Sequence, residues 1–148
     1  MLRTAGAAHV EVHSAGTGGW HVGDDMDRRA RAALVAHDYH HPRHVARRFE
    51  VEGFDEYDLI VALDRGHLQE LAELAAAADD PDAARDKIVL LRSFDPDAAA
   101  AGDLDVADPY YGGAQGFTDV LQQIERACRN LAASLDAAGQ HTPRFGPL

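Results

Sequence analysis

Apolar residues along the chain follow two alternating patterns, one typical of short buried strands and the other of amphipathic helices. Runs of the first kind predict strands at Val10–His13, Tyr57–Leu63 and Lys87–Leu91. Apolar residues that recur every three or four positions predict helices from about Met26 to His37 and from about Phe117 to Ala137. Strands that alternate with helices usually form a parallel sheet covered on both faces. The sequence therefore predicts an α/β fold, a three-layer sandwich around a short parallel sheet.

A further helix is predicted directly after the second strand, because Asp64 is a good N-cap and an apolar stripe follows it. Two segments have no such stripe. We expect a charged turn at Asp79–Asp86 and a long acidic loop from Asp95 to Gly113.

Chain length and charge limit the organisation and the partners. The 148 residues, of which 46% are hydrophobic, are enough for one packed domain, which we expect to span residues 1–138. Residues 139–148 contain two prolines and are predicted to be a flexible tail. The formal net charge of −11 argues against a nucleic-acid partner, since binding a polyphosphate needs a concentrated basic surface.

Cysteine usage and hydropathy bear on the compartment. With Cys128 as the single cysteine, no internal disulfide can form, which is typical of a reducing environment. No apolar run approaches membrane-spanning length, and the first residues lack the apolar segment of a signal peptide. We therefore expect a cytoplasmic protein that does not bind membranes.

Several residues of chemical interest are interpreted as structural. Cys128 lies mid-helix on the apolar stripe, where burial opposes a thiolate, so we predict a core residue and not a nucleophile. The histidines between positions 37 and 44 share no helical face and have no cysteine beside them, so we predict no metal site. The glycines of residues 16–19 lack the third glycine of a dinucleotide-binding loop, and we expect no cofactor.

The stretch Asp108-Pro109-Tyr110-Tyr111-Gly112-Gly113 is the leading candidate for chemistry. An aspartate can donate a proton to a departing oxygen. Pro109 restricts the directions in which Asp108 presents its carboxyl group, and Tyr110 and Tyr111 offer flat apolar faces to an aromatic substrate. We interpret Asp108 as a general acid between two aromatic walls; the alternative is an Asp-Pro turn without a catalytic role.

Two residues near the first predicted strand are further candidates. Ser14 directly follows that strand, at the carboxyl end where ligand-facing residues collect in parallel sheets, although it is not part of a G-x-S-x-G elbow. Trp20 is either a core residue or the exposed wall of a pocket, and the sequence leaves both possibilities open.

Several short motifs, taken in order, resemble those of low-molecular-weight protein tyrosine phosphatases. The resemblance covers roughly Val10 to Leu131, and it is carried by Ser14-Ala15-Gly16-Thr17, Trp20-His21-Val22-Gly23, His44-Val45-Ala46-Arg47, Leu63-Asp64, Asp108-Pro109-Tyr110-Tyr111-Gly112 and the helix from Gln122 through Cys128-Arg129.

This resemblance implies a role for each matched residue. Asp108 would protonate the leaving oxygen of a phosphotyrosine protein or of a small aryl phosphate. Trp20, Tyr110 and Tyr111 would line the pocket for the aromatic ring. Ser14 and His44 would belong to the hydrogen bonds that support the phosphate loop.

The sequence departs from the family at the nucleophile. The family pattern C-x-x-x-x-x-R-S, which follows a first strand, does not occur in these 148 residues. Met1–Ala8 resembles the end of the helix that should follow that loop. We therefore expect the first strand to be missing from between the strands at Val10–His13 and Tyr57–Leu63, and the chain as given to be inactive.

Two other functions remain open. A non-catalytic relative could bind phosphotyrosine or act as a regulatory domain without any chemistry. An arsenate reductase-like protein shares the fold, but it needs the missing cysteine and further redox cysteines, and Tyr110-Tyr111 favours a phosphatase.

Overall fold

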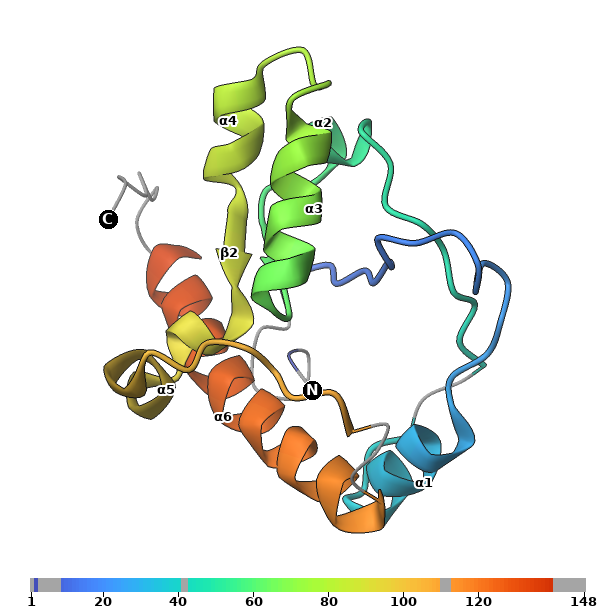
Figure 1. The fold of residues 1–148 in the computed structure, drawn as a ribbon. Helices are drawn as coiled ribbons and strands as arrows, with labels where there is room; N and C mark the ends of the chain where they lie inside the picture. Colours follow the sequence, from blue (N-terminus) through green and yellow to red (C-terminus); the bar gives the residue numbers. More distant parts are fainter. Residues whose placement is uncertain (1, 3–8, 41–42, 110–112, 140–148) are drawn as a thin grey trace.

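The computed structural model of the chain describes residue 2 and residues 9–40, 43–109 and 113–139 (Figure 1). In chain order, the described elements are α1 (Arg28–Ala36), α2 (Gly53–Glu56), β1 (Ile60–Ala62), α3 (Arg65–Ala75), α4 (Pro81–Asp86), β2 (Ile88–Leu90), the 3₁₀ helix η1 (Leu91–Phe94), α5 (Pro96–Ala101) and α6 (Gly113–Gly139).

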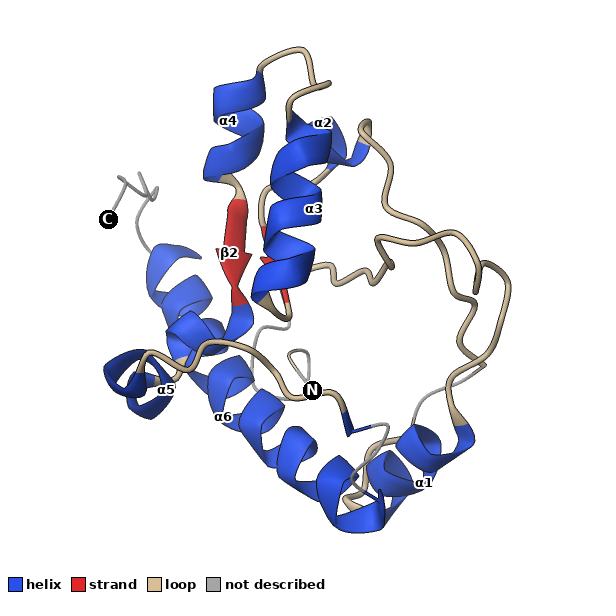
Figure 2. Cartoon of the chain, viewed as in Figure 1, coloured by secondary structure: helices blue, strands red, loops and turns tan. Residues whose placement is uncertain are grey.

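The two strands β1 and β2 form a parallel sheet, with α3 in the connection between them (Figure 2). Ile60 pairs with Ile88 and Ala62 with Leu90. These strands lie inside the predicted segments Tyr57–Leu63 and Lys87–Leu91, so the predicted α/β fold with a short parallel sheet is confirmed.

Side chains of β1 alternate between two hydrophobic clusters. Ile60 and Ala62 are buried with Leu71 of α3, whereas Val61 packs against the cluster formed by η1 and α6, which includes Leu91. Such alternation is expected for a strand with packed helices on both faces. The sheet therefore separates a layer of α3 and α4 from a layer of α6.

The helices predicted at Met26–His37 and Phe117–Ala137 are present with slightly different bounds. α1 spans Arg28–Ala36 and α6 spans Gly113–Gly139. Arg29 of α1 stacks over the ring of Phe117 on α6, with 5.2 Å between the guanidinium carbon and the ring centre. No helix among the described residues is both long and apolar enough to cross a membrane.

The predicted helix after Asp64 is also confirmed. The Asp64 carboxylate accepts a hydrogen bond from the His67 backbone N–H at 2.7 Å, which caps α3.

The predicted strand at Val10–His13 is wrong. Residues 11–15 are irregular, and the first pairing along the chain is a single parallel bridge between Gly16 and Arg48. A strand is stabilised by the hydrogen bonds of a neighbouring strand, and the sheet in the described part of the chain consists of β1 and β2 alone. The alternating pattern at 10–13 therefore does not suffice to form a strand.

Two segments predicted to be irregular contain helices. The expected turn at Asp79–Asp86 holds α4, and the expected loop from Asp95 to Gly113 begins with α5. In both cases an aspartate caps the helix and the following proline occupies its first turn. The Asp-Pro pair, which reads as a turn, is in these two places the start of a helix.

Candidate active site

The first group of candidate residues lies on two segments, residues 14–24 and 43–49, that run side by side between α1 and the rest of the molecule (Figure 1). Residues 17–23 of the first segment form bends and turns. We call the two segments the two-segment ribbon. Backbone hydrogen bonds of 2.7–2.9 Å connect them, namely Gly16 N–H to Arg47 C=O, Phe49 N–H to Gly16 C=O, Gly23 N–H to Ala46 C=O and Ala46 N–H to Asp24 C=O.

Ser14, Trp20 and His44 all belong to this ribbon. The carbonyl of Ser14 accepts a hydrogen bond from Arg47 Nε at 3.0 Å. The His44 backbone N–H donates to Asp25 Oδ1 at 3.0 Å, and Asp25 also pairs with Arg31. The structure thus brings three of the candidate residues onto one ribbon that is held to α1.

Trp20 is strongly exposed, with 83% of its surface accessible, so the possibility that it is a core residue is wrong. Its indole ring lies directly over the backbone of Gly18. A Cβ atom at Gly18 would come within 2.5 Å of the ring, so a side chain there would displace it. The ring therefore occupies space that is open only because residue 18 is a glycine.

Asp108 lies on another part of the molecule, at the end of the loop formed by residues 102–108, which we call the acid loop. Asp108 is exposed, and Tyr110 and Tyr111 lie outside the described residues. The N–H of Val106 donates to the carbonyl of Leu63 at 2.8 Å, directly after the last residue of β1. The loop therefore crosses the carboxyl end of the strand, where parallel sheets place their ligands.

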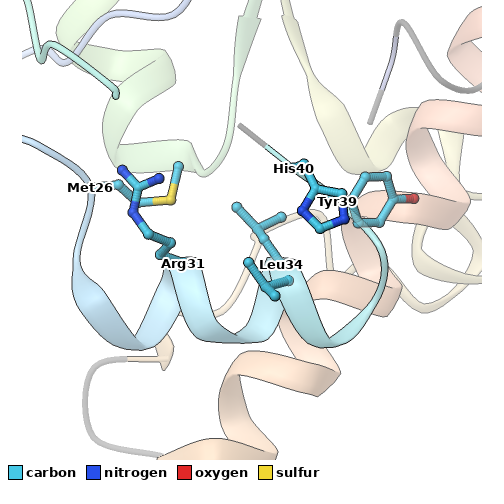
Figure 3. Close-up of a pocket in the computed structure, with 6 residues that line it drawn as sticks. Met26, Arg31, Leu34, Tyr39 and His40 are labelled. Atoms are coloured by element: carbon cyan, nitrogen blue, oxygen red, sulfur yellow. The ribbon is translucent and has the colours of Figure 1, made fainter. Parts of the chain in front are cut away.

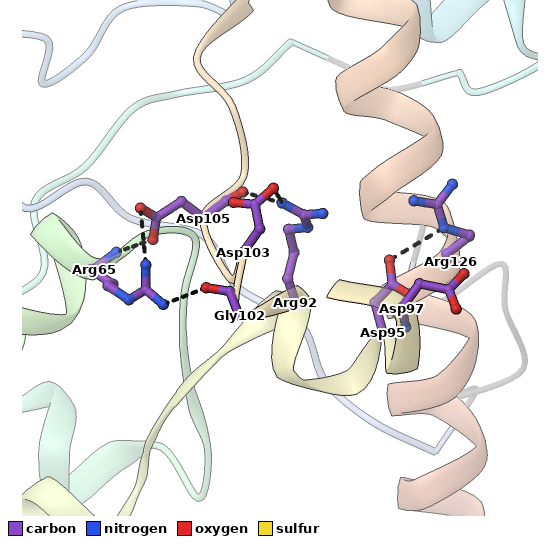
Figure 4. A network of polar contacts seen from close by, with 8 residues as sticks. All are labelled: Arg65, Arg92, Asp95, Asp97, Gly102, Asp103, Asp105 and Arg126. Atoms are coloured by element: carbon purple, nitrogen blue, oxygen red, sulfur yellow. Dashed lines mark hydrogen bonds and ion pairs between the residues drawn. The ribbon is translucent and has the colours of Figure 1, made fainter. Parts of the chain in front are cut away.

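A buried arginine holds the acid loop from one side through hydrogen bonds (Figure 4). Arg92 follows β2 in sequence, and its side chain is 7% exposed. One terminal nitrogen, Nη1, donates to the Asp105 carbonyl at 2.6 Å and to Asp103 Oδ2 at 3.1 Å. Within the described residues, the Nε atom of Arg92 is buried without a hydrogen-bond partner. An unpaired buried donor of this kind costs about 1–3 kcal/mol.

A second arginine, at the start of α3, also forms hydrogen bonds with the loop. The backbone N–H of Arg65 donates to Asp105 Oδ1 at 2.8 Å, and its guanidinium lies 3.9 Å from Asp105 Oδ2. The same guanidinium donates to the Gly102 carbonyl at 2.9 Å. The side chain of Arg65 is 55% exposed, so solvent screens its ion pair, and the backbone hydrogen bond holds the carboxylate more firmly.

The helix that precedes the acid loop is itself tied to α6 (Figure 4). Asp95 is 2% exposed, and it caps α5 through the backbone N–H of Asp97 at 3.2 Å. Its other oxygen accepts a hydrogen bond from Arg126 Nε of α6 at 3.3 Å. This contact fixes η1 and α5 against the longest helix.

Cys128 is confirmed as a core residue. It is 7% exposed and packs with Leu91, Ala127 and Leu131. Burial raises the pKa of its thiol above the ordinary value of 9.0. A nucleophile needs the opposite shift, so Cys128 is unsuited to attack phosphorus.

A small surface hollow lies beside α1 (Figure 3). It is lined by Met26, Arg31, Leu34, Val35, Tyr39 and His40, none of which is a candidate site residue. Burial, together with a hydrogen bond to Glu125, raises the pKa of the Tyr39 hydroxyl. Among the residues that the structure describes, no three His, Cys, Asp or Glu side chains form a group that could hold a metal ion.

Arg65 and Arg92 were missed in the sequence. A signal for them exists, because both follow the end of a predicted parallel strand by one or two residues, where functional side chains collect. Charge alone did not distinguish them from the other arginines of the surface.

Comparison with known protein families gives one matching family model, described as low molecular weight phosphotyrosine protein phosphatase, over residues 1–141. The chain is 51% identical to a low molecular weight protein-tyrosine-phosphatase of Streptomyces coelicolor over 135 residues, which are 90% of this chain and 79% of that protein. It is 42% identical to low molecular weight protein-tyrosine phosphatase A of Mycobacterium tuberculosis over 138 residues, which are 93% of this chain and 77% of that protein.

Solved structures show the same fold. A protein tyrosine phosphatase from Entamoeba histolytica with Hepes in its active site superposes with a TM-score of 0.80 at 27% identity, over 93% of this chain and 86% of that chain. YfkJ from Bacillus subtilis superposes with a TM-score of 0.76 at 25% identity, over 92% of this chain and 82% of that chain.

Proposed function

The chain belongs to the low molecular weight phosphotyrosine protein phosphatase family, and from this premise we propose that it serves the hydrolysis of phosphotyrosine in proteins or of small aryl phosphates. Asp108 is the general acid of this reaction. The observation that carries the proposal is the position of Asp108, exposed on a loop that is anchored at the carboxyl end of β1.

The acid is needed because the leaving group is poor. When a thiolate attacks phosphorus, the P–O bond to the phenol breaks and the phenol oxygen leaves with the electron pair. A proton from Asp108 neutralises that oxygen as the bond breaks. Water then hydrolyses the cysteinyl phosphate, releasing inorganic phosphate and restoring the thiolate.

The other candidate residues have supporting roles in this proposal. Trp20, Tyr110 and Tyr111 line the pocket for the aromatic ring. The exposure of Trp20 is consistent with a pocket wall, since a buried indole could not reach a ligand. Ser14 and His44 support the phosphate loop, and the hydrogen bonds that hold the backbone of both residues in the ribbon are in keeping with that role.

The nucleophile is the part of the site that these 148 residues do not supply. These 148 residues contain no C-x-x-x-x-x-R-S motif, and Cys128 is buried in the core with a raised pKa. We therefore propose that these 148 residues carry the acid and part of the pocket, and that by themselves they do not hydrolyse aryl phosphates measurably.

The test measures hydrolysis of 4-nitrophenyl phosphate and phenyl phosphate by two proteins. One is the 148-residue chain, and the other is a fusion that places a strand and a C-x-x-x-x-x-R-S loop before Met1. We expect activity from the fusion alone, and Asp108→Asn in the fusion should slow turnover by roughly 10²–10⁴-fold, most on phenyl phosphate. Strong hydrolysis by the 148 residues that Cys128→Ser abolishes would contradict the placement of the nucleophile.

A second candidate is a phosphotyrosine-binding or regulatory module, favoured by the absence of the nucleophile motif from the printed residues. It predicts that the 148-residue chain binds a phosphotyrosine peptide, whereas the unphosphorylated peptide does not compete. Calorimetry on the two peptides separates this candidate from the enzyme.

We propose that residues 1–138 form one domain, that the protein works in the cytoplasm, and that it does not act on nucleic acid. The net charge of −11 supports the last point. Of the predicted tail at 139–148, residues 140–148 lie outside the described residues.

A further inference from the structure

We propose that Arg92 and Arg65 are positioning residues for the general acid: together they fix the acid loop on the carboxyl end of β1 and so determine where Asp108 stands. This inference rests on the proposed function, in which Asp108 donates the proton. Neither arginine was assigned a role by the motifs described above.

The contacts of the two arginines converge on one residue, Asp105. Arg92 binds its carbonyl oxygen, and Arg65 binds its carboxylate through a backbone N–H and faces it with the guanidinium. The neighbouring residues are held as well, because Asp103 pairs with Arg92 and Val106 donates to Leu63. Asp105 is therefore held from η1 and from α3, and its neighbour Val106 is held at the end of β1.

Burial of Arg92 indicates that its place is set by the loop and not by favourable solvation. Removing a guanidinium from water is unfavourable unless its N–H groups find partners, and the Nε of Arg92 has none within the described residues. The partners that Arg92 does have, Asp103 and Asp105, both belong to the acid loop. We therefore infer that Arg92 fixes the position of the acid loop more than it stabilises the fold.

Only Val106 and Ala107 separate Asp105 from Asp108, so Asp108 can move little relative to Asp105. We call the contacts of Arg92 and Arg65 with Asp103 and Asp105 the clamp. Pro109 further restricts the backbone of Asp108. Proton transfer requires the donor within hydrogen-bond distance of the leaving oxygen, and a misplacement of about 1 Å can cost a large part of the rate. Movement at Asp105 is therefore passed directly to the carboxyl group of Asp108.

The first measurement uses amide hydrogen exchange on the 148-residue chain with Arg92→Gln, Arg65→Gln and a control, Arg85→Gln, whose exposed partner Asp82 lies on α4. Loss of one net hydrogen bond should speed exchange in residues 103–108 by about five- to tenfold in Arg92→Gln. Arg65→Gln should have a smaller effect because its backbone N–H remains, and the control should have none. Exchange in β2 should stay at the parental rate.

Arg92→Lys keeps the positive charge and has N–H donors on a single nitrogen, so its exchange at residues 103–108 should be slower than that of Arg92→Gln. If Arg92→Gln does not fold, Asp105→Ala tests the clamp from the loop side, since it removes both contacts with the Arg65 main chain and guanidinium. Unchanged exchange at 103–108 in the folded variants, or an equal rise throughout the molecule, would overturn the proposal.

The second measurement uses the fusion protein and compares a poor leaving group, phenol, with a good one, 4-nitrophenol. Arg92→Gln should lower kcat on phenyl phosphate roughly tenfold more than on 4-nitrophenyl phosphate, with KM unchanged, because only the proton donor is displaced. Equal losses on both substrates would overturn the positioning role. If Asp108→Asn has no effect on either substrate, the proposed function itself is wrong, and the exchange data still decide whether the two arginines hold the loop.

Discussion

The sheet half of the molecule, which comprises β1, β2, η1 and the helices α2 to α6, differs in construction from the two-segment ribbon. In the sheet half, β1 and β2 pair in register and side chains such as Leu71 and Ala75 are buried between the strands and helices. In the ribbon, residues 14–24 and 43–49 are joined by a few backbone hydrogen bonds, and Trp20, Val22 and Val45 are exposed. Both regions contain parallel backbone pairing, yet among the described residues only the sheet half has a cluster of buried apolar side chains around that pairing.

This difference shows what a parallel strand requires. β1 has a neighbour on one side and packed helices on both faces, so its apolar residues are removed from water and its backbone is paired. The segment at Val10–His13 has a strand-like sequence, but among the described residues no strand pairs with it. The sheet half should therefore contribute most of the free energy of unfolding, whereas the ribbon should mainly hold candidate site residues in place.

The largest expected effect comes from truncating the core of the sheet half. Leu71→Ala should destabilise the protein by about 3 kcal/mol, because Leu71 is 6% exposed and the loss leaves a cavity beside β1. Val45→Ala in the ribbon, at 59% exposure, should change the free energy of unfolding by less than about 0.5 kcal/mol. Urea unfolding of both variants measures the contrast, and equal losses would show that the ribbon has a core of its own.

A smaller effect is expected where α5 is tied to α6. Asp95→Ala should cost about 2 kcal/mol, since it removes the cap of α5 and the partner of Arg126, whose exposure screens the pair. Asp95→Asn keeps a capping oxygen and should cost less. Asp97→Ala, an exposed neighbour on α5, is the matched control and should leave the urea midpoint unchanged. A loss at Asp97 equal to that at Asp95 would argue that helix propensity, and not the buried contact, is responsible.

Much of the sheet half could be predicted from the sequence, because its signals are local. The apolar runs at Tyr57–Leu63 and Lys87–Leu91, the cap at Asp64 and the stripe of α6 each depend on residues close together in the chain. The strand at Val10–His13 could not be judged in this way, since pairing depends on a neighbour distant in sequence. The Asp-Pro pairs that open α4 and α5 were misread because the same dipeptide opens turns and helices.

The candidate site could be predicted only in part. Ser14, Trp20, His44 and Asp108 were selected by motif, and the structure places the first three on one ribbon and Asp108 on the acid loop. Their chemical roles stay predictions. The clamp that holds the acid loop was missed, because a buried arginine and an exposed one look alike until the chain is folded.

Alkaline pH should weaken the sheet half. Burial raises the pKa of Cys128 above the ordinary value of 9.0, so the folded protein keeps a proton that the unfolded chain releases. The stabilising contribution is complete below pH 9 and is lost as the pH rises from about 9 through the raised pKa. Urea midpoints between pH 8 and pH 10.5 should fall less steeply for Cys128→Ala than for the parent. Parallel curves would show that the thiol does not titrate differently in the two states.

Acid pH should weaken the ribbon, and this is the smallest effect because the group concerned is fully exposed. Backbone N–H donation from Met26 and His44, with the charge of Arg31, lowers the pKa of Asp25 below the ordinary value of 3.8. For a lowered pKa the contribution is present above pH 3.8 and is lost as the pH falls from 3.8 through the folded value. The amide proton resonances of Met26 and His44 should therefore titrate together below pH 3.8, and Asp25→Asn should abolish that titration.

The resonances of β1 should not follow it, since no contact with Asp25 connects that strand to the ribbon among the described residues. A titration of β1 with the same midpoint would mean that the ribbon and the sheet half unfold as one unit, and the contrast between the two regions would then be lost.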